Sequence, residues 1–510
     1  MKSKTIIAVA VLALCWQHYI FGTNMPEGKS KIQARLDSIS ALEPLRSSQF
    51  GILAVKMSGD TVAEYASMKK MVPASNMKLI TTGLALNELG SDYRFETKIG
   101  YSGSISGGVL NGDLYIIGGG DPTIGSKDTI AMSVETLFAK WKNFLSKAGI
   151  KAINGSIIGD GRYFEGPIEE ESWQYEDIGT YYGTGGNGLC FYRNIQGFKV
   201  IPAKNPGSNP EVTPTYPDTP WMKFSYNCTT GDKGTGDKLY LFGTDLYPVA
   251  EMRGSYGVDR KQNTVKCSNK FGAYTCAYYF MKYLIINGIN IKGGCADIDV
   301  AGRIRKSPGS EADGSPAEAS GKINILGKTN SPEIKRIAYI TNNRSDNFYA
   351  DALFRLMGKK FAGSAKYETC QDYAGKALSK LGIDAASGCR IIDGSGLSKK
   401  NYLSPDFFCR FLKAMTGTPV FETYIGTLTQ PDQGSQAGRL KNSPEQMKER
   451  IYWKSGSMDG VRCYSGYILP SNGIEEDTII FSVMLNNCTA PSWKMNLLLD
   501  SIIAGIAAEN

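Results

Sequence analysis

The chain has 510 residues and a mass of 55.5 kDa, which predicts two or more domains, or one domain that carries a large insertion. Charged residues at 21% and hydrophobic residues at 42% are typical of a globular protein and exclude a disordered or fibrous one. The net charge of +8 is modest and its basic residues are scattered, which does not favour nucleic acid as a partner.

The N-terminus has the pattern of a secretory signal. Residues 1–22 combine a basic start at Lys2 and Lys4, a short apolar run and the small residue Gly22. The one histidine of the sequence, His18, lies in this segment. We therefore expect an exported, periplasmic protein whose mature form has no imidazole, which excludes Ser-His-Asp hydrolases, Cys-His proteases and His-ligated zinc enzymes. A retained N-terminal anchor is the alternative, and no later segment has the length of a membrane span.

Eleven cysteines are present, and all but Cys15 follow the signal segment. An even number in an exported chain permits disulfides, and buried free thiols are the alternative. Cys370 and Cys389 are the one pair that we predict to be bridged. Because there is no C-x-x-C pair and no histidine after His18, we expect neither a metal nor a cofactor.

The first folded elements are a hairpin and a helix. Apolar residues 50–57, a Ser-Gly-Asp turn and residues 61–65 predict two paired strands. Pro73-Ala74-Ser75 then opens a helix that we expect from residue 76 to residue 89, where Gly90 ends it.

The middle of the chain differs from its two ends in its pattern of predicted secondary structure. Strand-like pieces at 114–117 and 152–158 alternate with Gly-rich turns, a helix is predicted over 129–147, and 204–220 reads as a Pro-rich loop. After residue 323 we expect strands at 337–341 and 478–485 and a last helix over 493–508.

This change of pattern predicts the domain organisation. We expect an α/β domain built from both chain ends, residues 23–92 and 310–510. A mostly β insertion over 93–309, made of two small subdomains, would interrupt it.

Without histidine, a hydrolytic serine needs another base, and a lysine one helical turn away is the natural candidate. S-x-x-K occurs at Ser67–Lys70, in a polar connector shortly before Pro73, and at Ser75–Lys78, where the predicted helix begins. At the second position the N–H of the serine lies at the positive end of the helix dipole and can face an oxyanion. A helix N-cap is the structural alternative for this serine.

Two further motifs follow in the sequence. Ser345-Asp346-Asn347 precedes a helix-like stretch at 348–357, and Lys454-Ser455-Gly456 lies in a strand-like stretch before another at 463–469. Taken alone, the first could be a loop with an Asx-turn and the second a surface turn. All three motifs in this order are much harder to obtain by accident.

This constellation resembles the penicillin-recognising serine acyl-enzymes, whose motifs are S-x-x-K, S-D-N and K-T-G, with K-S-G here in third place. The gaps are 345 − 78 = 267 and 454 − 347 = 107 residues. The long first gap is similar to that of the D-alanyl-D-alanine carboxypeptidase/endopeptidase family, the class C low-molecular-mass penicillin-binding proteins of the penicillin-binding protein 4 type. Other stretches similar to this family are Pro73–Thr82, Gly119–Pro122, Trp173–Asp177, Asp393–Ser398 and Gly460-Val461.

The resemblance implies an α/β (α+β) transpeptidase/β-lactamase-like fold and a set of catalytic roles. Ser75 would attack the carbonyl of the penultimate D-alanine and form an ester. Lys78 would be the neutral base, its pKa lowered by burial and by the charge of Lys454. Ser345 would pass the proton to the leaving amine, and Asn347 would hold the substrate amide and the lysine.

The remaining roles concern the substrate. Lys454 and Ser455 would bind its terminal carboxylate, and Gly456 would let an extended peptide lie along the strand. The N–H groups of Ser457 and of the nucleophile would form the oxyanion hole. The family also suggests Asp160 as a contact for the amine of a diamino acid, and a turn aspartate is the alternative.

We therefore expect a penicillin-sensitive D,D-peptidase that acts on peptidoglycan stem peptides, is acylated by β-lactams, and possesses carboxypeptidase and possible endopeptidase activity. A β-lactamase or esterase on the same scaffold and a non-catalytic wall-binding scaffold are the alternatives. The sequence leaves the oligomeric state open.

Overall fold

The computed structural model describes residues 30–261, 263–298 and 322–509, so the predicted signal segment lies outside the described residues. Contacts between residues divide the chain into two compact units. The first unit comprises Met1–Asn76, Tyr402–Thr416 and Leu428–Asn510, and the second comprises Met77–Asn401 and Gly417–Thr427. This division cuts the chain at places other than the predicted domain boundaries, and the division into a catalytic domain and an insertion stays a prediction.

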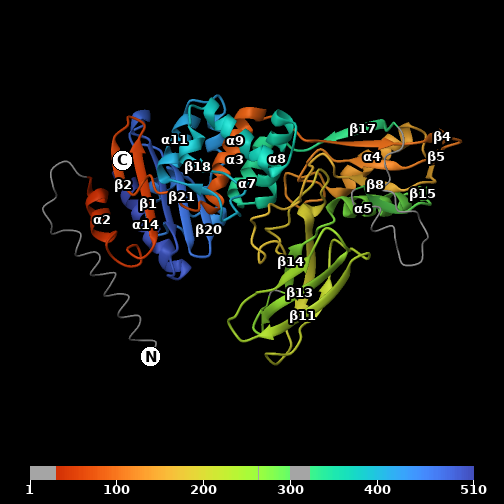
Figure 1. The fold of residues 1–510 in the computed structure, drawn as a ribbon, viewed down its shortest axis with the longest axis horizontal. Helices are drawn as coiled ribbons and strands as arrows, with labels where there is room; N and C mark the ends of the chain where they lie inside the picture. The colour runs from red at the N-terminus through yellow and green to blue at the C-terminus, as the bar shows by residue number, and fades with distance from the viewer. Residues whose placement is uncertain (1–29, 262, 299–321, 510) are drawn as a thin grey trace. The chain divides into compact units, whose positions relative to one another are not determined.

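The first unit is built on a five-stranded antiparallel sheet with the order β2-β1-β22-β21-β20. In Figure 1 its N-terminal strands are red and its C-terminal strands blue, so the two ends of the chain share one sheet, as the sequence predicted. The strands are β1 (Gln49–Lys56), β2 (Thr61–Tyr65), β20 (Ile451–Met458), β21 (Val461–Ile468) and β22 (Ile479–Asn486).

Helices cover both faces of this sheet. Helices α2 (Lys31–Ile39) and α14 (Ser492–Ala507) pack with the alternate strand residues on one face into a single apolar core. Tyr467, which points to the opposite face, donates a 2.8 Å hydrogen bond to the carbonyl of Leu412 in α11 (Pro405–Thr416). Because both faces are covered, all eight residues of β22 are buried, and the strand is apolar except for Ser482 and Asn486.

The second unit contains a group of helices around α3 (Met77–Leu89), whose first ten residues are all buried. A helix that is buried all round lies inside a core rather than on a surface. The other helices of the group are α7 (Ile334–Asn343), α8 (Asn347–Ala362), α9 (Tyr367–Lys380), α10 (Ala385–Gly388) and α12 (Phe421–Ile425), with the short strand β18 (Cys389–Arg390). The short strand β19 (Tyr402–Leu403) belongs to the first unit.

The predicted strand over 337–341 is wrong, because these residues belong to helix α7. Ile334, Ile337, Ala338 and Thr341 are buried, which is the i, i+3, i+4, i+7 spacing of one helix face. A five-residue apolar window could not distinguish the two states, since the period becomes visible only over the whole helix.

The middle of the chain forms two sheets covered by two helices. The sheets have the orders β16-β8-β6-β3-β17 and β15-β7-β5-β4, and helices α4 (Val134–Lys147) and α5 (Gly272–Ile286) pack their apolar side chains against them. Helix α4 begins later than predicted, because Ser133 caps it by accepting the N–H of Thr136. The strands are β3 (Glu96–Tyr101), β4 (Ser104–Ser106), β5 (Val109–Asn111), β6 (Leu114–Ile117), β7 (Ala152–Ile153), β8 (Ile157–Asp160), β15 (Asn290–Ile291), β16 (Cys295–Asp297) and β17 (Asn324–Asn330).

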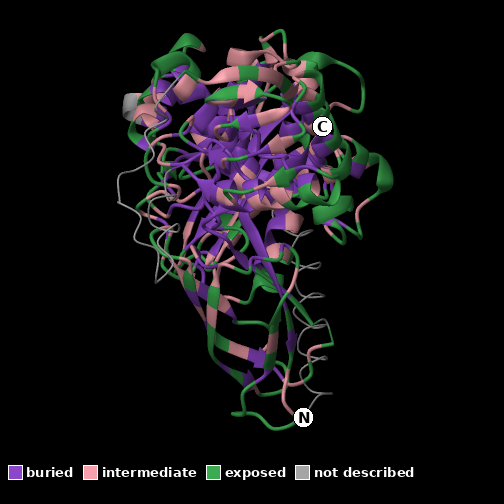
Figure 2. Cartoon of the chain, turned by 90° about the vertical axis from the view of Figure 1, so that its right-hand side faces the viewer, coloured by how far each residue is buried: buried purple, intermediate pink, exposed green. Residues whose placement is uncertain are grey.

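Two three-stranded sheets, β10-β9-β14 and β11-β13-β12, enclose a small apolar core of their own. Their strands are β9 (Ile195–Ile201), β10 (Glu211–Pro214), β11 (Lys223–Gly231), β12 (Tyr240–Gly243), β13 (Val249–Gly257) and β14 (Thr264–Ser268). The expected loop 204–220 therefore contains a strand. Figure 2 shows buried residues, in purple, where helices and sheets pack and exposed residues, in green, on many of the connecting loops.

The cysteines of the described residues are all free thiols, so the predicted Cys370–Cys389 bridge is wrong. A methyl group added at Gly358 of α8 would lie 2.4 Å from the Cys370 sulfur, which shows how closely this thiol packs between α8 and α9. Burial raises the pKa of Cys370 to about 12 and keeps it an inert thiol. Within the described residues, no helix has the length and apolarity needed to cross a bilayer.

Candidate active site

The turn that carries Ser75 belongs to the first unit. A 3-10 turn, η1 (Ala74–Asn76), closes with a 3.1 Å hydrogen bond from the N–H of Asn76 to the carbonyl of Pro73 and continues directly into α3. Ser75 is partly exposed, whereas its neighbours from Pro73 to Ile80 are buried. Ala74 has a φ of 45°, a backbone conformation that costs free energy in a residue with a side chain. The tertiary structure therefore holds the serine on a strained turn.

Strand β20, at the edge of the sheet, carries the K-S-G motif in the same unit. A methyl group at Gly456 would lie 2.5 Å from the carbonyl oxygen of Pro73 and 3.0 Å from the N–H nitrogen of Asn76. Only a glycine lets this strand approach the Ser75 turn so closely.

The residues on either side of this glycine differ in exposure. Lys454 is 1% exposed and donates a 2.7 Å hydrogen bond to the carbonyl of Ser455. The Ser455 hydroxyl accepts a 2.9 Å hydrogen bond from the side chain of Gln436, and Ser457 is exposed. The first unit thus brings together Ser75 and the K-S-G strand.

Lys78 lies in the second unit, in the first turn of α3, and its side chain is fully buried. Its Nζ donates a 2.6 Å hydrogen bond to Oδ1 of Asn347 and another of 2.6 Å to the carbonyl oxygen of Ser395. Both acceptors are uncharged, so neither provides a negative charge to offset the desolvation free energy of a buried ammonium. Within the second unit, the S-x-x-K lysine and the S-D-N asparagine are therefore in direct contact.

Burial lowers the pKa of Lys78 to about 8, and the carboxylates of Asp351, Asp393 and Asp346 oppose this shift. Burial as the main cause confirms the expectation from the sequence, and the contribution expected from Lys454 stays a prediction. At pH 7 a lysine with this pKa is neutral in roughly one molecule in ten, against fewer than about one in a thousand for an ordinary lysine.

This pKa predicts the pH dependence of acylation. If Lys78 acts as a base, only its neutral form is active, so the acylation rate should rise about tenfold per pH unit below pH 8 and level off above it. Stopped-flow acylation by a penicillin between pH 6 and 9 measures this, with thermal unfolding at each pH as the control for an intact fold. A rate that is flat from pH 6 to 9 would contradict a titrating base with this pKa.

The S-D-N segment joins α7 to α8. Asp346 caps α8 by accepting the N–H of Tyr349 at 3.0 Å, and Asn347 is the first helical residue. Ser345 has a φ of 55°, so it too adopts a strained left-handed conformation. Asn347 also donates a 2.9 Å hydrogen bond from Nδ2 to the carbonyl of Tyr182. Both ends of the Asn347 amide are thereby fixed, which sets the direction in which Oδ1 meets the lysine.

The loop after β18 supplies the second acceptor of Lys78, and the sequence analysis did not find it. Its Asp393 carboxylate is fully buried and accepts four hydrogen bonds of 2.7–2.9 Å, from the N–H groups of Gly396 and Ser398 and from the side chains of Trp173 and Asn401. This carboxylate fixes the backbone around Ser395. The similarity of residues 393–398 to the family pointed to this loop. A backbone carbonyl can belong to any residue type, so the sequence could not identify the Ser395 carbonyl as an acceptor.

Asp351 is the other residue that sequence reasoning missed. It lies one helical turn after Asn347 on α8, and its Oδ1 accepts the N–H of Gly394 at 2.9 Å. Burial and the neighbouring Asp393 raise the pKa of Asp351 well above its usual value. Its spacing of four residues from Asn347 was the signal that could have identified it.

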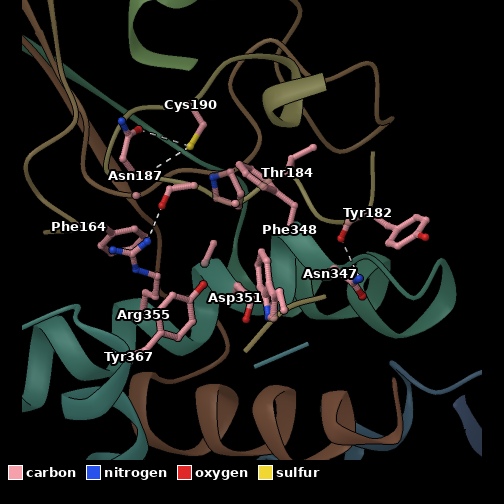
Figure 3. A pocket seen from close by; sticks show the side chains of 16 residues that line it. Phe164, Tyr182, Thr184, Asn187, Cys190, Asn347, Phe348, Asp351, Arg355 and Tyr367 are labelled. Atoms are coloured by element: carbon pink, nitrogen blue, oxygen red, sulfur yellow. Dashed lines mark hydrogen bonds between the residues drawn. The ribbon is translucent and has the colours of Figure 1, made fainter. Parts of the chain in front are cut away.

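A cavity lies beside these groups, as Figure 3 shows. Asn347, Asp351 and Arg355 follow one another on the same face of α8 and point into it, opposite Thr184 and Cys190. Oδ2 of Asp351 and the hydroxyl of Tyr367 are buried and have no hydrogen-bond partner among the residues that the structure describes. Two such groups beside one cavity are suited to an ordered water.

Asp160 lies at the end of β8 and is 5% exposed. Both of its carboxylate oxygens accept hydrogen bonds from Arg162, at 2.9 and 2.8 Å. Its carboxylate already has a cationic partner, and its role in substrate binding stays a prediction.

Comparisons with known proteins agree with these motifs. A model of the D-Ala-D-Ala carboxypeptidase 3 (S13) family matches residues 32–498. The chain is 25% identical over 479 residues to a D-alanyl-D-alanine carboxypeptidase of Actinomadura sp. strain R39, which covers 91% of this chain and 82% of that protein. It is also 25% identical over 474 residues to the penicillin-sensitive carboxypeptidase A of Dictyostelium discoideum, covering 86% and 82% respectively.

Among solved structures, penicillin-binding protein 4 of Haemophilus influenzae has the same fold, with a TM-score of 0.72 and 20% identity, and the match covers 91% of this chain and 96% of that one. The mixed α/β architecture with a sheet shared by both chain ends is thus the fold of that penicillin-binding protein. Since the family model extends from α2 into α14 and includes the S-x-x-K, S-D-N and K-S-G motifs, the chain belongs to the D-Ala-D-Ala carboxypeptidase 3 (S13) family.

Proposed function

We propose that the protein is a penicillin-sensitive serine D,D-peptidase that removes the terminal D-alanine of peptidoglycan stem peptides through an acyl-enzyme on Ser75. The observation that carries this proposal is the environment of Lys78. A fully buried lysine with a pKa of about 8 and two uncharged acceptors at 2.6 Å is poised to act as a neutral base.

The geometry of the amine supports this role. A neutral amine has two N–H groups and one lone pair. If the N–H groups point to Asn347 and Ser395, their positions fix the remaining tetrahedral direction, along which the lone pair must point. Ser75 precedes the lysine by three residues in a continuous 3-10 and α-helical run, the spacing that places two side chains on one face.

The reaction would proceed in two steps. Ser75 would lose its proton to Lys78 and attack the carbonyl carbon of the penultimate D-alanine. Ser345 would carry the proton to the nitrogen of the leaving D-alanine as the C–N bond breaks, and water would then hydrolyse the ester. Asn347 would hydrogen-bond the substrate amide while it holds the lysine.

The K-S-G strand would bind the substrate. Lys454 and Ser455 would receive the terminal carboxylate by charge and hydrogen bonding. The N–H groups of Ser457 and Ser75 would stabilise the oxyanion. The close approach of Gly456 to the turn of the nucleophile supports this arrangement, since a larger residue would push the strand away.

We further propose that the protein is exported to the periplasm, where peptidoglycan is its partner and β-lactams are covalent inhibitors. It would also cleave D,D cross-links, because a cross-link is the same D-Ala amide with a longer leaving amine. Asp160 would contact the amine of the diamino acid of the stem peptide.

The deciding experiment is digestion of a synthetic pentapeptide ending in D-Ala-D-Ala and of purified peptidoglycan, with mass spectrometry of the products. We expect stoichiometric release of one D-alanine from the pentapeptide and separation of cross-linked dimers into monomers. Lack of D-alanine release would contradict the proposal and favour a wall-binding scaffold. Rapid hydrolysis of the penicilloyl adduct would instead identify a β-lactamase.

A further inference from the structure

Two ion pairs of opposite polarity flank Ser345. Arg344, the residue before it, is paired with Asp128, and Asp346, the residue after it, is paired with Arg193. Asp128 and Arg193 both come from the middle of the chain, more than a hundred residues before the S-D-N motif. The residue that would pass the proton is therefore flanked by two ion pairs, each made with a different loop of the middle of the chain.

The pairs are partly withdrawn from solvent. The side chains of Asp128 and Asp346 are 7% and 6% exposed, whereas that of Arg344 is 50% exposed. A carboxylate this buried is stabilised by its partner, and loss of the arginine would leave an uncompensated buried charge. The coulombic influence of Asp346 and Asp128 in turn raises the pKa of Arg193.

Each carboxylate uses both of its oxygens. Oδ1 of Asp346 caps α8 by accepting the N–H of Tyr349, while its Oδ2 pairs with Arg193. Oδ2 of Asp128 accepts a 2.6 Å hydrogen bond from the hydroxyl of Tyr349, while its Oδ1 pairs with Arg344. The four charged groups and the tyrosine thus form one connected network around the start of α8, which leaves the segment little freedom to move.

The backbone shows why such support is needed. Ser345 has a φ of 55°, and Tyr192, Arg193 and Asn194 have φ values of 52°, 54° and 52°. Left-handed conformations of this kind cost free energy in residues with a side chain and persist only where the surroundings hold them. The backbone is therefore strained both at Ser345 and in the turn that carries Arg193.

We propose that Asp128 and Arg193 are positioning residues for Ser345, through which the middle segment of the chain sets the geometry of proton transfer to the leaving amine. The proposal rests on the proposed function. In that reaction the C–N bond breaks, the Ser75–acyl bond forms, and the serine proton ends on the amine nitrogen. A displacement of about 1 Å in such a relay can cost about a hundredfold in rate.

The test compares two substrates with the same acyl group, a D-Ala-D-Ala peptide and the corresponding thioester. An amine must be protonated as it leaves, whereas a thiolate with a pKa of about 8.5 can leave as an anion. We expect Arg193→Gln and Asp128→Asn to lower kcat for the peptide about 10- to 100-fold. The thioester should lose less than about threefold, and KM should stay nearly unchanged for both, since ground-state binding is kept.

Two further variants serve as controls. Arg193→Lys keeps the charge and should restore most of the peptide activity if an ion pair positions the loop. Arg253→Gln removes an ion pair with Glu251 on β13, a 2.6 Å contact, and should leave both substrates unaffected. Thermal unfolding identifies any variant that fails to fold, in which case the lysine variant provides the comparison.

The outcomes separate the hypotheses. Equal losses on peptide and thioester would overturn the proposal, because they indicate a general structural defect. Unchanged activity on both would overturn it as well. A wild-type chain that forms a stable penicilloyl adduct but cleaves neither substrate would overturn the proposed function, and the positioning role with it.

Discussion

We expect Ser75→Ala to abolish covalent labelling of the chain by a fluorescent penicillin. The penicilloyl group would be held through an ester to the serine oxygen, so removal of that oxygen removes the point of attachment. Ser75 is partly exposed, and the loss of one hydroxyl there should leave the fold intact. Gel fluorescence measures the labelling, and mass spectrometry of the wild-type adduct should place the mass increase on the peptide that contains Ser75.

The chain offers a matched control in its other S-x-x-K sequence, Ser67–Lys70. Ser67 is buried and donates a 2.5 Å hydrogen bond to Glu64, in a connector outside the regular elements. Ser67→Ala should be labelled like the wild type. Undiminished labelling of Ser75→Ala would falsify the assignment of the nucleophile, and loss of labelling in Ser67→Ala alone would identify the other serine instead.

We expect Lys78→Ala to lower the rate of acylation by at least about a hundredfold, the usual contribution of a positioned base. The alanine variant cannot take the proton of the serine, so only a water molecule is left to accept it. Because the lysine side chain is fully buried, Lys78→Met, which keeps more of its volume, is the second variant for the case that alanine destabilises the helix core. Stopped-flow measurement with a chromogenic β-lactam gives the rate constant.

In Lys78→Ala and Lys78→Met, the remaining acylation rate should no longer increase between pH 6 and pH 8. The increase in the wild type would come from deprotonation of the lysine, which both variants lack. Lys70→Ala is the control. Lys70 is the exposed last residue of the other S-x-x-K sequence, Ser67–Lys70, and its variant should retain the wild-type acylation rate and pH profile. A near-normal rate in Lys78→Ala and Lys78→Met would mean that another group removes the proton.

Much of the local structure could be predicted because local spacing determines it. The hairpin at 50–65, the helix after Pro73 and the paired strands around the K-S-G motif follow from alternation, turn residues and helix-start signals, and β1, β2, α3, β20 and β21 confirm them. The strand expected at 337–341 failed because a five-residue apolar window is ambiguous between a strand and one face of α7. The cysteine pair failed because a distance in sequence does not define a distance in space.

In the candidate site, too, some residues could be predicted from the sequence and others were found only in the structure. The absence of histidine after His18 and the three ordered motifs were sufficient to propose Ser75, Lys78 and Asn347 as site residues, and the structure places Lys78 and Asn347 in contact. The carbonyl of Ser395, the buried Asp393 and the unpartnered oxygen of Asp351 came only from the structure. No residue-type pattern marks a backbone acceptor or a cavity.

The sequence by itself determined which residues are candidates for the chemistry, because a reaction without imidazole needs particular residue types at particular spacings, and the three motifs supply them. The tertiary structure alone decided the burial that lowers the pKa of Lys78 and the ion pairs on either side of Ser345. The first depends on desolvation, opposed by carboxylates such as Asp393, and the second on Asp128 and Arg193, which are remote in sequence and close only after folding. Desolvation and ion pairing between distant residues arise only in the folded chain, so they can be determined only from the tertiary structure.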